Sequence, residues 1–360
     1  MSRPFQRAAT APLALARSAR PCVLGKAGPS SLQIGGSRSA SLSTSSRPRL
    51  TSRLSVNEIG TGVRNIRHSS STSTSAFEGI KPVDLAYDVI QPPKVNEGAE
   101  GQCLVVCHGL FGSKQNWRSL AKAFSTQLGM PVYALDLRNH GTSPHAEPHT
   151  YAAMATDLDH LFRKLDLKGI NLLGHSMGGK AVMAFALNPA FNQNLRSLIS
   201  VDMSPAVGRM SPEFLAYTQG MRKVDQAGVK SKAEADKILQ AVEPTLATRQ
   251  FLLTNTRTLP SGQLAFRIPL DLLDRSIPHI GDFPYAPADS DDSTQVTWSG
   301  PTLFLKGEHS KYINRKNIPT AQAYFPRMRM EVLDAGHWVH AEQPGETLRV
   351  VKEFVEGIGR

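Results

Sequence analysis

Acidic side chains are almost absent from the first 75 residues, where Glu58 alone stands against 11 lysines and arginines. The whole chain holds 41 basic and 30 acidic residues, so 30 basic and 29 acidic residues remain for positions 76–360. The formal charge of +11 is therefore concentrated in the N-terminal segment, and the rest of the chain is nearly neutral. This distribution does not indicate a nucleic-acid-binding body.

The basic N-terminal segment is rich in arginine and serine and has short apolar patches such as Leu13–Ala16, but no continuous apolar stretch. A secretory signal needs such a stretch, whereas a mitochondrial transit peptide is arginine-rich, serine-rich and poor in acids. We therefore expect residues 1–75 to be a mitochondrial transit peptide and disordered leader, and residues 76–360 to be the folded domain. A basic tail without a targeting role is the alternative.

Cysteine is scarce, and a disulfide framework is therefore not expected. Of the three cysteines, Cys22 lies in the leader, and Cys103 and Cys107 lie on one apolar run. On a strand, residues four apart share a face but are too far apart to form a disulfide. We expect two buried free thiols, which is compatible with a reducing compartment such as the mitochondrial matrix.

Long apolar runs and cofactor motifs are also absent from the sequence. No run approaches the roughly 20 apolar residues of a transmembrane helix, so we expect no transmembrane segment. A phosphate-binding glycine-rich loop, a cofactor lysine and a zinc cluster are likewise not found, so no cofactor and no metal are predicted. The pair His340 and Glu342 is weak evidence for a metal because it offers only two ligands.

From about residue 80, apolar runs typical of strands alternate with helical patterns, which predicts an α/β fold with a mostly parallel sheet flanked by helices. The predicted strands are Val83–Ile90, Cys103–Cys107, Val132–Leu135, Ile170–Leu173, Leu195–Val201, Thr302–Lys306 and Met328–Leu333. The predicted helices between and after them are Trp117–Gln127, Tyr151–Leu165, Met177–Leu187 and Gly345–Glu356.

The alternation stops between about residues 207 and 297. This stretch reads as helical pieces followed by a polar linker around Pro284–Asp292. We predict a helical lid inserted after the sixth strand, above the carboxyl ends of the sheet, where ligands bind in open α/β folds. The predicted helical pieces are Pro212–Val224, Lys232–Val242 and Pro244–Leu253.

The run Gly-His-Ser-Met-Gly at positions 174–178 follows an apolar strand and precedes an alanine-rich helical stretch. This context is typical of a nucleophile elbow, a turn so sharp that side chains at its two glycine positions would collide with backbone. We predict that Ser176 is the nucleophile, held in a strained conformation with its hydroxyl exposed. His175 is expected to be a packing residue.

A second glycine-containing run, His-Gly-Leu-Phe-Gly at positions 108–112, ends the strand Cys103–Cys107. A tetrahedral intermediate needs two hydrogen-bond donors aimed at its oxyanion. By position, these donors should be the backbone N–H groups of Leu110 and Met177. Taken alone, the run would be read as a simple strand-to-helix turn, and its occurrence together with the elbow changes that interpretation.

The chain has 11 histidines, so the residue type alone does not identify the general base. The position of the histidine relative to the predicted strands does. His337 follows the last apolar strand directly, at the sheet edge where the serine should lie. His140, in the turn after the strand Val132–Leu135, is expected to be structural.

The acid that orients His337 has three candidates. Asp202 ends the strand Leu195–Val201, and neighbouring parallel strands present their ends to the same histidine loop, so it ranks first. Asp271 in the predicted lid ranks second. Glu308, just after the strand Thr302–Lys306, ranks third, because no aspartate stands there.

The motifs together resemble those of an α/β-hydrolase group that contains bacterial YbfF-type esterases, mitochondrial abhydrolase-domain proteins of animals and fungal ethanol acetyltransferases. The resemblance implies the α/β-hydrolase fold and supports Asp202 as the acid, although animal members assign that role to a lid residue corresponding to Asp271. The matching segments are His108–Ser113 with Asn116 and Trp117, Asp136 and Arg138–Gly141 through Ser143–His145, Gly174–Lys180, Val201–Pro205 and Gly336–Glu342.

These features lead to three functional hypotheses. The first is a serine hydrolase for short-chain acyl esters or thioesters, including acyl-CoA, that acts through an acyl-enzyme. The second is an alcohol O-acetyltransferase that uses acetyl-CoA and ethanol, and the third is a non-catalytic mitochondrial binding protein. Ser176 excludes dehalogenase and epoxide hydrolase chemistry, which needs aspartate at the elbow. The oligomeric state stays open.

Overall fold

The computed structural model of the protein describes residues 75–286 and 296–358. Residues 1–74 of the predicted transit peptide, which include Cys22, lie outside the described residues, as do positions 287–292 of the predicted linker. Within the described ranges, no helix is both long enough and apolar enough to span a membrane.

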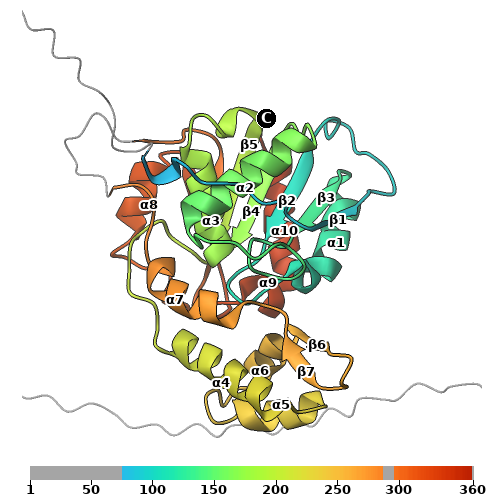
Figure 1. Ribbon diagram of the computed structural model, residues 1–360. Coiled ribbons are helices and arrows are strands. Elements are labelled where there is room, and N and C mark those ends of the chain that lie inside the picture. The colour runs from blue at the N-terminus through green and yellow to red at the C-terminus, as the bar shows by residue number, and fades with distance from the viewer. Residues whose placement is uncertain (1–74, 287–295, 359–360) are drawn as a thin grey trace, which may run out of the picture. The chain divides into compact units, whose positions relative to one another are not determined.

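A seven-stranded sheet with the order β1-β3-β2-β4-β5-β8-β9 forms the centre of the body (Figure 1). β1 runs antiparallel to β3, and every other neighbouring pair is parallel. The prediction of a mostly parallel sheet is confirmed, but the first strand begins at Tyr87 and not at Val83. The strands are β1 (Tyr87–Ile90), β2 (Cys103–Cys107), β3 (Val132–Leu135), β4 (Ile170–His175), β5 (Leu195–Val201), β8 (Thr302–Gly307) and β9 (Met328–Leu333).

Helices cover both faces of the sheet, because the central strands are apolar on both sides. In β2, Val105 packs with the core under α2 and α3, whereas Leu104 and Val106 pack with the core under α1 and α10. The helices around the sheet are α1 (Arg118–Leu128), α2 (Tyr151–Lys164), α3 (Met177–Leu187), α8 (Ile318–Tyr324), α9 (Val339–Glu342) and α10 (Pro344–Glu356). Short 3₁₀ turns are η1 (Ser75–Phe77), η2 (Lys114–Trp117) and η3 (Asn192–Asn194).

The two cysteines of β2 are buried free thiols on one face of the sheet, as predicted. Burial raises the pKa of Cys103 to about 12 and raises that of Cys107 further. Both are therefore uncharged and poorly nucleophilic at neutral pH.

The helical insertion lies between β5 and β8 and comprises Glu213–Ile280. It follows β5, the fifth strand of the described residues, whereas the prediction placed it after a sixth strand. It also contains a β-hairpin and a fourth helix that the sequence patterns did not predict. Its elements are α4 (Glu213–Ala227), α5 (Lys232–Leu239), α6 (Leu246–Leu253), β6 (Thr256–Thr258), β7 (Leu264–Phe266) and α7 (Leu270–Ile280).

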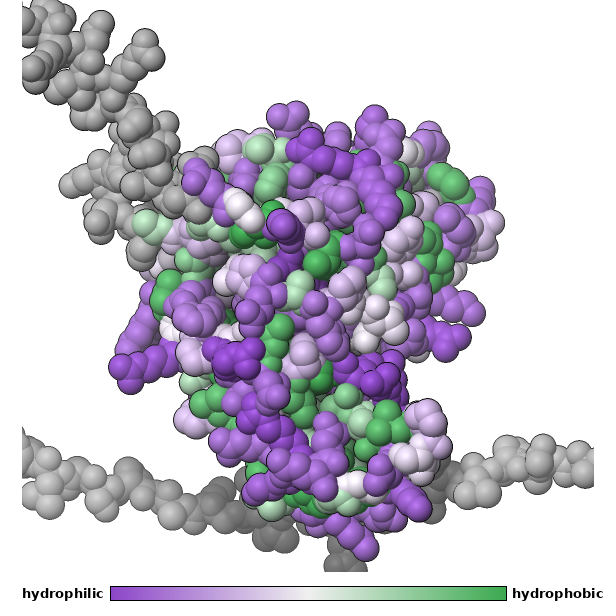
Figure 2. Space-filling model, in the orientation of Figure 1, coloured by the Kyte–Doolittle hydropathy of each residue, from purple (hydrophilic) through white to green (hydrophobic). Residues whose placement is uncertain are grey.

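The insertion lies beyond one end of the sheet (Figure 1). On the face of the molecule drawn in Figure 2, hydrophobic residues occur in small groups separated by hydrophilic ones, over the sheet body and the insertion alike. Such a mixture is usual for a protein surface.

Candidate active site

The turn between β4 and α3 holds Ser176 in a strained conformation with a positive φ of 54° and a ψ of −119°. The glycines on either side permit this turn. A Cβ added at Gly174 would lie 2.2 Å from the Gly178 carbonyl oxygen, and one added at Gly178 would lie 2.5 Å from the His108 carbonyl oxygen. Both positions therefore require glycine, as the elbow motif predicts.

The structure joins three of the predicted site residues by hydrogen bonds. The Nε2 atom of His337 lies 2.9 Å from the Ser176 hydroxyl oxygen, and its Nδ1 atom lies 2.7 Å from a carboxylate oxygen of Asp202. The serine comes from the end of β4, the aspartate from the end of β5 and the histidine from the loop after β9. Because all three strands are parallel, their carboxyl ends lie at one edge of the sheet.

Asp202 is completely buried and makes further hydrogen bonds that fix its carboxylate. One oxygen accepts from the Gly307 N–H at 3.0 Å, and the other accepts from the Ser310 hydroxyl as well as from His337. The residue also has a positive φ of 51°, which turns the chain sharply after β5. The carboxylate is thus supplied with donors and kept in one orientation.

The other two candidates for the acid lie elsewhere. Asp271 forms a salt bridge of 2.9 Å with Arg222 inside the insertion, and its side chain is 81% exposed. Glu308 is exposed beside β8, near His309 and Asp334. Neither makes a hydrogen bond to His337.

The predicted oxyanion donors lie next to the serine. Leu110 and Met177 line the same cavity as Ser176, and Met177 is the first residue of α3. Their backbone N–H groups donate to no protein acceptor in the described part of the chain. Two N–H groups that line one cavity with Ser176, one of them at a helix N-terminus, suit the stabilisation of a developing negative charge.

Buried histidines hold the loop that carries Leu110. The Nε2 atom of His140 accepts from the Phe111 N–H at 3.1 Å, and its Nδ1 atom lies 3.0 Å from the Arg138 carbonyl oxygen. The Nε2 atom of His108 accepts from the Leu137 N–H in the same way. Burial lowers the pKa of both imidazoles, so they stay neutral and can act as acceptors.

Asn255, in the insertion, is a functional contact that the sequence patterns missed. Its side-chain amide donates to the Phe111 carbonyl at 2.7 Å, and the residue is buried. The insertion therefore touches the oxyanion loop directly. No local motif marks Asn255, because its role depends on a partner 144 positions away.

The loop around His337 is supported from several sides. The carboxylate of Glu342 accepts from the Gly336 N–H at 2.7 Å and from the Trp338 N–H at 3.2 Å, the two residues that flank the histidine. The ring of Tyr312 stacks on the imidazole with centroids 4.0 Å apart. Glu342 and Tyr312 were not predicted to have these roles.

Two histidines beside this loop have structural contacts. The Nε2 atom of His175 lies 2.9 Å from the His337 carbonyl oxygen, so His175 is more than the packing residue predicted from sequence. His340 stacks on Trp117 with centroids 4.2 Å apart, and burial lowers its pKa to about 3. The sequence alone suggested His340 and Glu342 weakly as metal ligands. In the structure His340 stacks on Trp117, and Glu342 accepts hydrogen bonds from the loop around His337.

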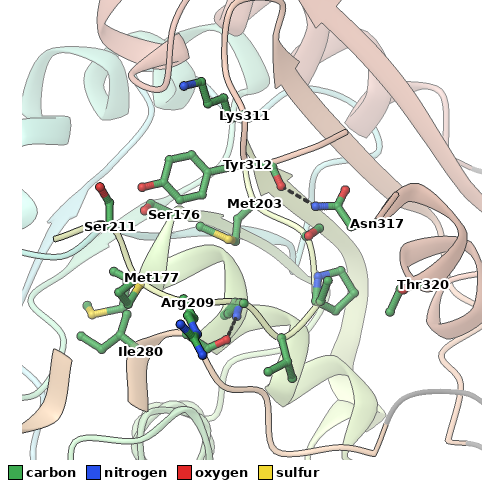
Figure 3. A pocket seen from close by; sticks show the side chains of 18 of the residues that line it. Ser176, Met177, Met203, Arg209, Ser211, Ile280, Lys311, Tyr312, Asn317 and Thr320 are labelled. Carbon is green, nitrogen blue, oxygen red and sulfur yellow. Dashed lines mark hydrogen bonds between the residues drawn. The ribbon is translucent and has the colours of Figure 1, made fainter. Parts of the chain in front are cut away.

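Two cavities meet at Ser176. The smaller, about 270 Å³, is lined by His337 and by aromatic side chains, among them Phe251 of the insertion. The larger, about 780 Å³, is lined by Met177 (Figure 3), and His337 does not belong to its lining. Leu110 and Tyr312 contribute to both. The serine thus faces two spaces of different size and chemistry.

Comparisons with known proteins show the family and the fold. A family model described as the alpha/beta hydrolase fold matches residues 102–344. The chain is 35% identical over 300 residues to a probable alcohol acetyltransferase of Saccharomyces cerevisiae, with 76% of this chain and 84% of that protein covered. It is 36% identical over 290 residues to the sn-1-specific diacylglycerol lipase ABHD11 of Xenopus tropicalis, with 79% and 86% covered. Among solved structures, a marine microorganism esterase is 31% identical with a TM-score of 0.66, covering 76% of this chain and 99% of that one.

Proposed function

The chain belongs to the α/β-hydrolase family and is an enzyme of that class, and we propose that it hydrolyses acyl esters through an acyl-enzyme on Ser176. The observation that carries the proposal is the hydrogen-bonded series from Ser176 through His337 to Asp202. The relatives named as a lipase and an esterase support the same chemistry. The third hypothesis, a binding protein without catalysis, has no comparable support.

In the first half-reaction, the Ser176 hydroxyl oxygen attacks the ester carbonyl carbon while its proton passes to Nε2 of His337. Asp202 keeps the imidazole in the tautomer that can accept this proton and stabilises the imidazolium that forms. The N–H groups of Leu110 and Met177 stabilise the oxyanion. The carbon–oxygen bond to the alcohol then breaks, and His337 returns the proton to the departing oxygen. Water attacks the acyl-enzyme by the same proton transfers and releases the acid.

A fluorophosphonate probe tests this assignment because it reacts with an activated serine. We expect labelling at Ser176, and we expect Ser176→Ala to lose both the label and several powers of ten of esterase turnover. Ser204→Ala is the matched control for labelling, because Ser204 lines the same cavity without bonding to His337. Undiminished turnover in Ser176→Ala would exclude the acyl-enzyme.

The smaller cavity favours a second candidate function, transfer of the acyl group to a small alcohol. His337 lines this cavity, so the nucleophile that it activates must approach from there. The walls are largely aromatic and include Phe214, Phe251 and Leu252 of the insertion. Such walls hold an alcohol near the acyl carbon and raise its effective concentration relative to water.

Acetyl-CoA with an ethanol series tests transfer and the proposed action on thioesters together. We expect free acetate without ethanol, and ethyl acetate increasing at the expense of acetate as ethanol is added. Chromatography of both products gives the partition. Absence of ethyl acetate at every ethanol concentration would exclude transfer, and stable acetyl-CoA would exclude the action on this thioester.

We further propose that the protein acts in mitochondria, on the strength of the arginine-rich and serine-rich composition of residues 1–75. A fusion of these residues to a fluorescent protein should be imported and shortened. A version with its arginines replaced by glutamine is the control and should stay in the cytosol. A cytosolic signal from the unchanged fusion would contradict the proposal.

A further inference from the structure

The larger cavity beside Ser176 has an unbalanced charge. Its lining includes four basic side chains and one acidic side chain, Glu213. Figure 3 shows Arg209 and Lys311 on different sides of Ser176, so the positive charge is spread around the cavity. The basic residues are Lys180, Arg209, Lys311 and Lys316. A cavity of this kind attracts an anionic ligand.

Lys180 is the buried member of this set, with 4% of its surface exposed. Its ammonium donates to the Gly281 carbonyl at 2.8 Å and to the Asp282 carbonyl at 3.0 Å, and it lies 5.6 Å from the centroid of the Tyr151 ring. Among the described residues, no carboxylate forms a salt bridge with it. The Asp282 carboxylate is exposed and lies 3.4 Å from His279.

A buried ammonium without a carboxylate partner is costly, and carbonyl contacts do not neutralise its charge. An ammonium also has three donors, of which the two carbonyls use two. Burial lowers the pKa of Lys180 to about 8, so the group is still mostly charged at neutral pH. One donor and one positive charge thus remain for a ligand in the cavity.

The position of Lys180 relative to the serine fixes which part of a substrate it meets. Lys180 follows Ser176 by four residues, its backbone N–H donates to the Ser176 carbonyl, and both residues line the larger cavity. The leaving alcohol must receive its proton from His337, which lines the smaller cavity only. The acyl chain therefore extends into the larger cavity, toward Lys180.

We propose that the acyl group of the preferred substrate carries a carboxylate at its far end and that Lys180 binds this carboxylate. The inference rests on the proposed ester hydrolysis at Ser176 and narrows its substrate class to half-esters or half-thioesters of dicarboxylic acids. Arg209, Lys311 and Lys316 at the exposed part of the cavity attract the same anionic substrate.

Matched ester pairs test the inference on the wild-type enzyme. Monoethyl glutarate and monoethyl adipate carry the carboxylate on the acyl chain, and ethyl pentanoate and ethyl hexanoate are their neutral counterparts. The pair 4-acetoxybutanoate and butyl acetate places the charge on the leaving group instead. A charge-assisted hydrogen bond should give the half-esters an advantage of about 10- to 100-fold in kcat/KM. The 4-acetoxybutanoate should have none over butyl acetate.

Replacing Lys180 by methionine keeps its length and removes its charge. We expect Lys180→Met to remove most of the half-ester advantage, while Lys180→Arg retains part of it. Lys352→Met is the control, because Lys352 lies on α10, outside the cavity lining. If Lys180→Met does not fold, competitive inhibition of the wild-type enzyme by adipate, compared with neutral adipamide, measures the same subsite.

The outcomes distinguish the proposed carboxylate subsite from the ester hydrolysis on which it rests. Hydrolysis of neutral esters without any preference for the half-esters, or with equal inhibition by adipate and adipamide, would overturn the carboxylate subsite alone. A preference for 4-acetoxybutanoate would also overturn it, because the charge would then belong to the leaving group. Failure to hydrolyse any of the esters would overturn the proposed ester hydrolysis as well.

Discussion

Replacing Asp202 by asparagine changes one atom of a buried side chain and should nearly stop turnover. The two oxygens of the carboxylate accept hydrogen bonds from different donors. The Gly307 N–H donates to one oxygen, whereas His337 and the Ser310 hydroxyl donate to the other. An asparagine can keep only one oxygen, so its NH₂ group must face one of the two sides.

The structure determines which side the NH₂ group faces. A backbone N–H cannot change from donor to acceptor, so an NH₂ group facing Gly307 would leave two donors about 3.0 Å apart. The Ser310 hydroxyl can rotate and the imidazole can change tautomer. The NH₂ group should therefore face His337, which then carries its proton on Nε2 and cannot accept the Ser176 proton.

In other Ser-His-Asp enzymes the wrong tautomer reduces kcat by about 10⁴-fold, which corresponds to roughly 5 kcal/mol of transition-state stabilisation. We expect Asp202→Asn to lose about 10³- to 10⁴-fold in kcat, with a smaller change in KM. Steady-state hydrolysis of a chromogenic acetate ester measures both constants, and circular dichroism verifies folding.

Asp271→Asn and Glu308→Gln are the controls and should remain within about threefold of the wild-type enzyme, because both side chains are exposed away from His337. If Asp271→Asn is inactive while Asp202→Asn retains a tenth or more of its activity, the assignment of the acid is wrong.

Two further substitutions test how the surrounding structure supports the site. Glu342→Gln leaves one side-chain oxygen for the N–H groups of the two residues that flank His337, so kcat should fall about 10- to 100-fold at nearly constant KM and melting temperature. Glu346→Gln is the control. An unchanged kcat would show that the contacts of Glu342 are dispensable for catalysis. Asp157→Asn leaves the Arg138 guanidinium buried without its bidentate carboxylate partner. A denaturant titration should show that the free energy of unfolding is lower by about 3–5 kcal/mol. A loss below about 1 kcal/mol would refute this reasoning.

The parts of the site that could be predicted from sequence are those that local patterns determine. The elbow at Ser176 needs a strand, a sharp turn with two glycines and a helix, and all of these lie within one short segment. His337 and Asp202 each follow an apolar strand, and the parallel order of β4, β5, β8 and β9 brings the carboxyl ends of these strands together. The sheet and its covering helices follow from the same alternation.

The parts that could not be predicted depend on contacts between distant segments. The hairpin of β6 and β7 has only three residues in each strand, which is too short for a reliable alternation pattern. The sequence suggests Glu342 only weakly, as one of two metal ligands, and gives Lys180 no role of its own. Their roles appear only when the Gly336 and Trp338 amides and the carbonyls of Gly281 and Asp282 are placed beside them.

The contacts of the helical insertion bear on how substrate enters. A lid that swings open would have to release its links to the sheet body. Asn255 ties the middle of the insertion to the Phe111 carbonyl, on the loop that supplies one oxyanion donor. Lys180 ties the residues after α7 to α3, one turn from Ser176. Both links are buried, so breaking either leaves unsatisfied polar groups and disturbs a residue of the site. The insertion is therefore better described as a fixed wall of both cavities, and substrate reaches Ser176 through the cavities themselves.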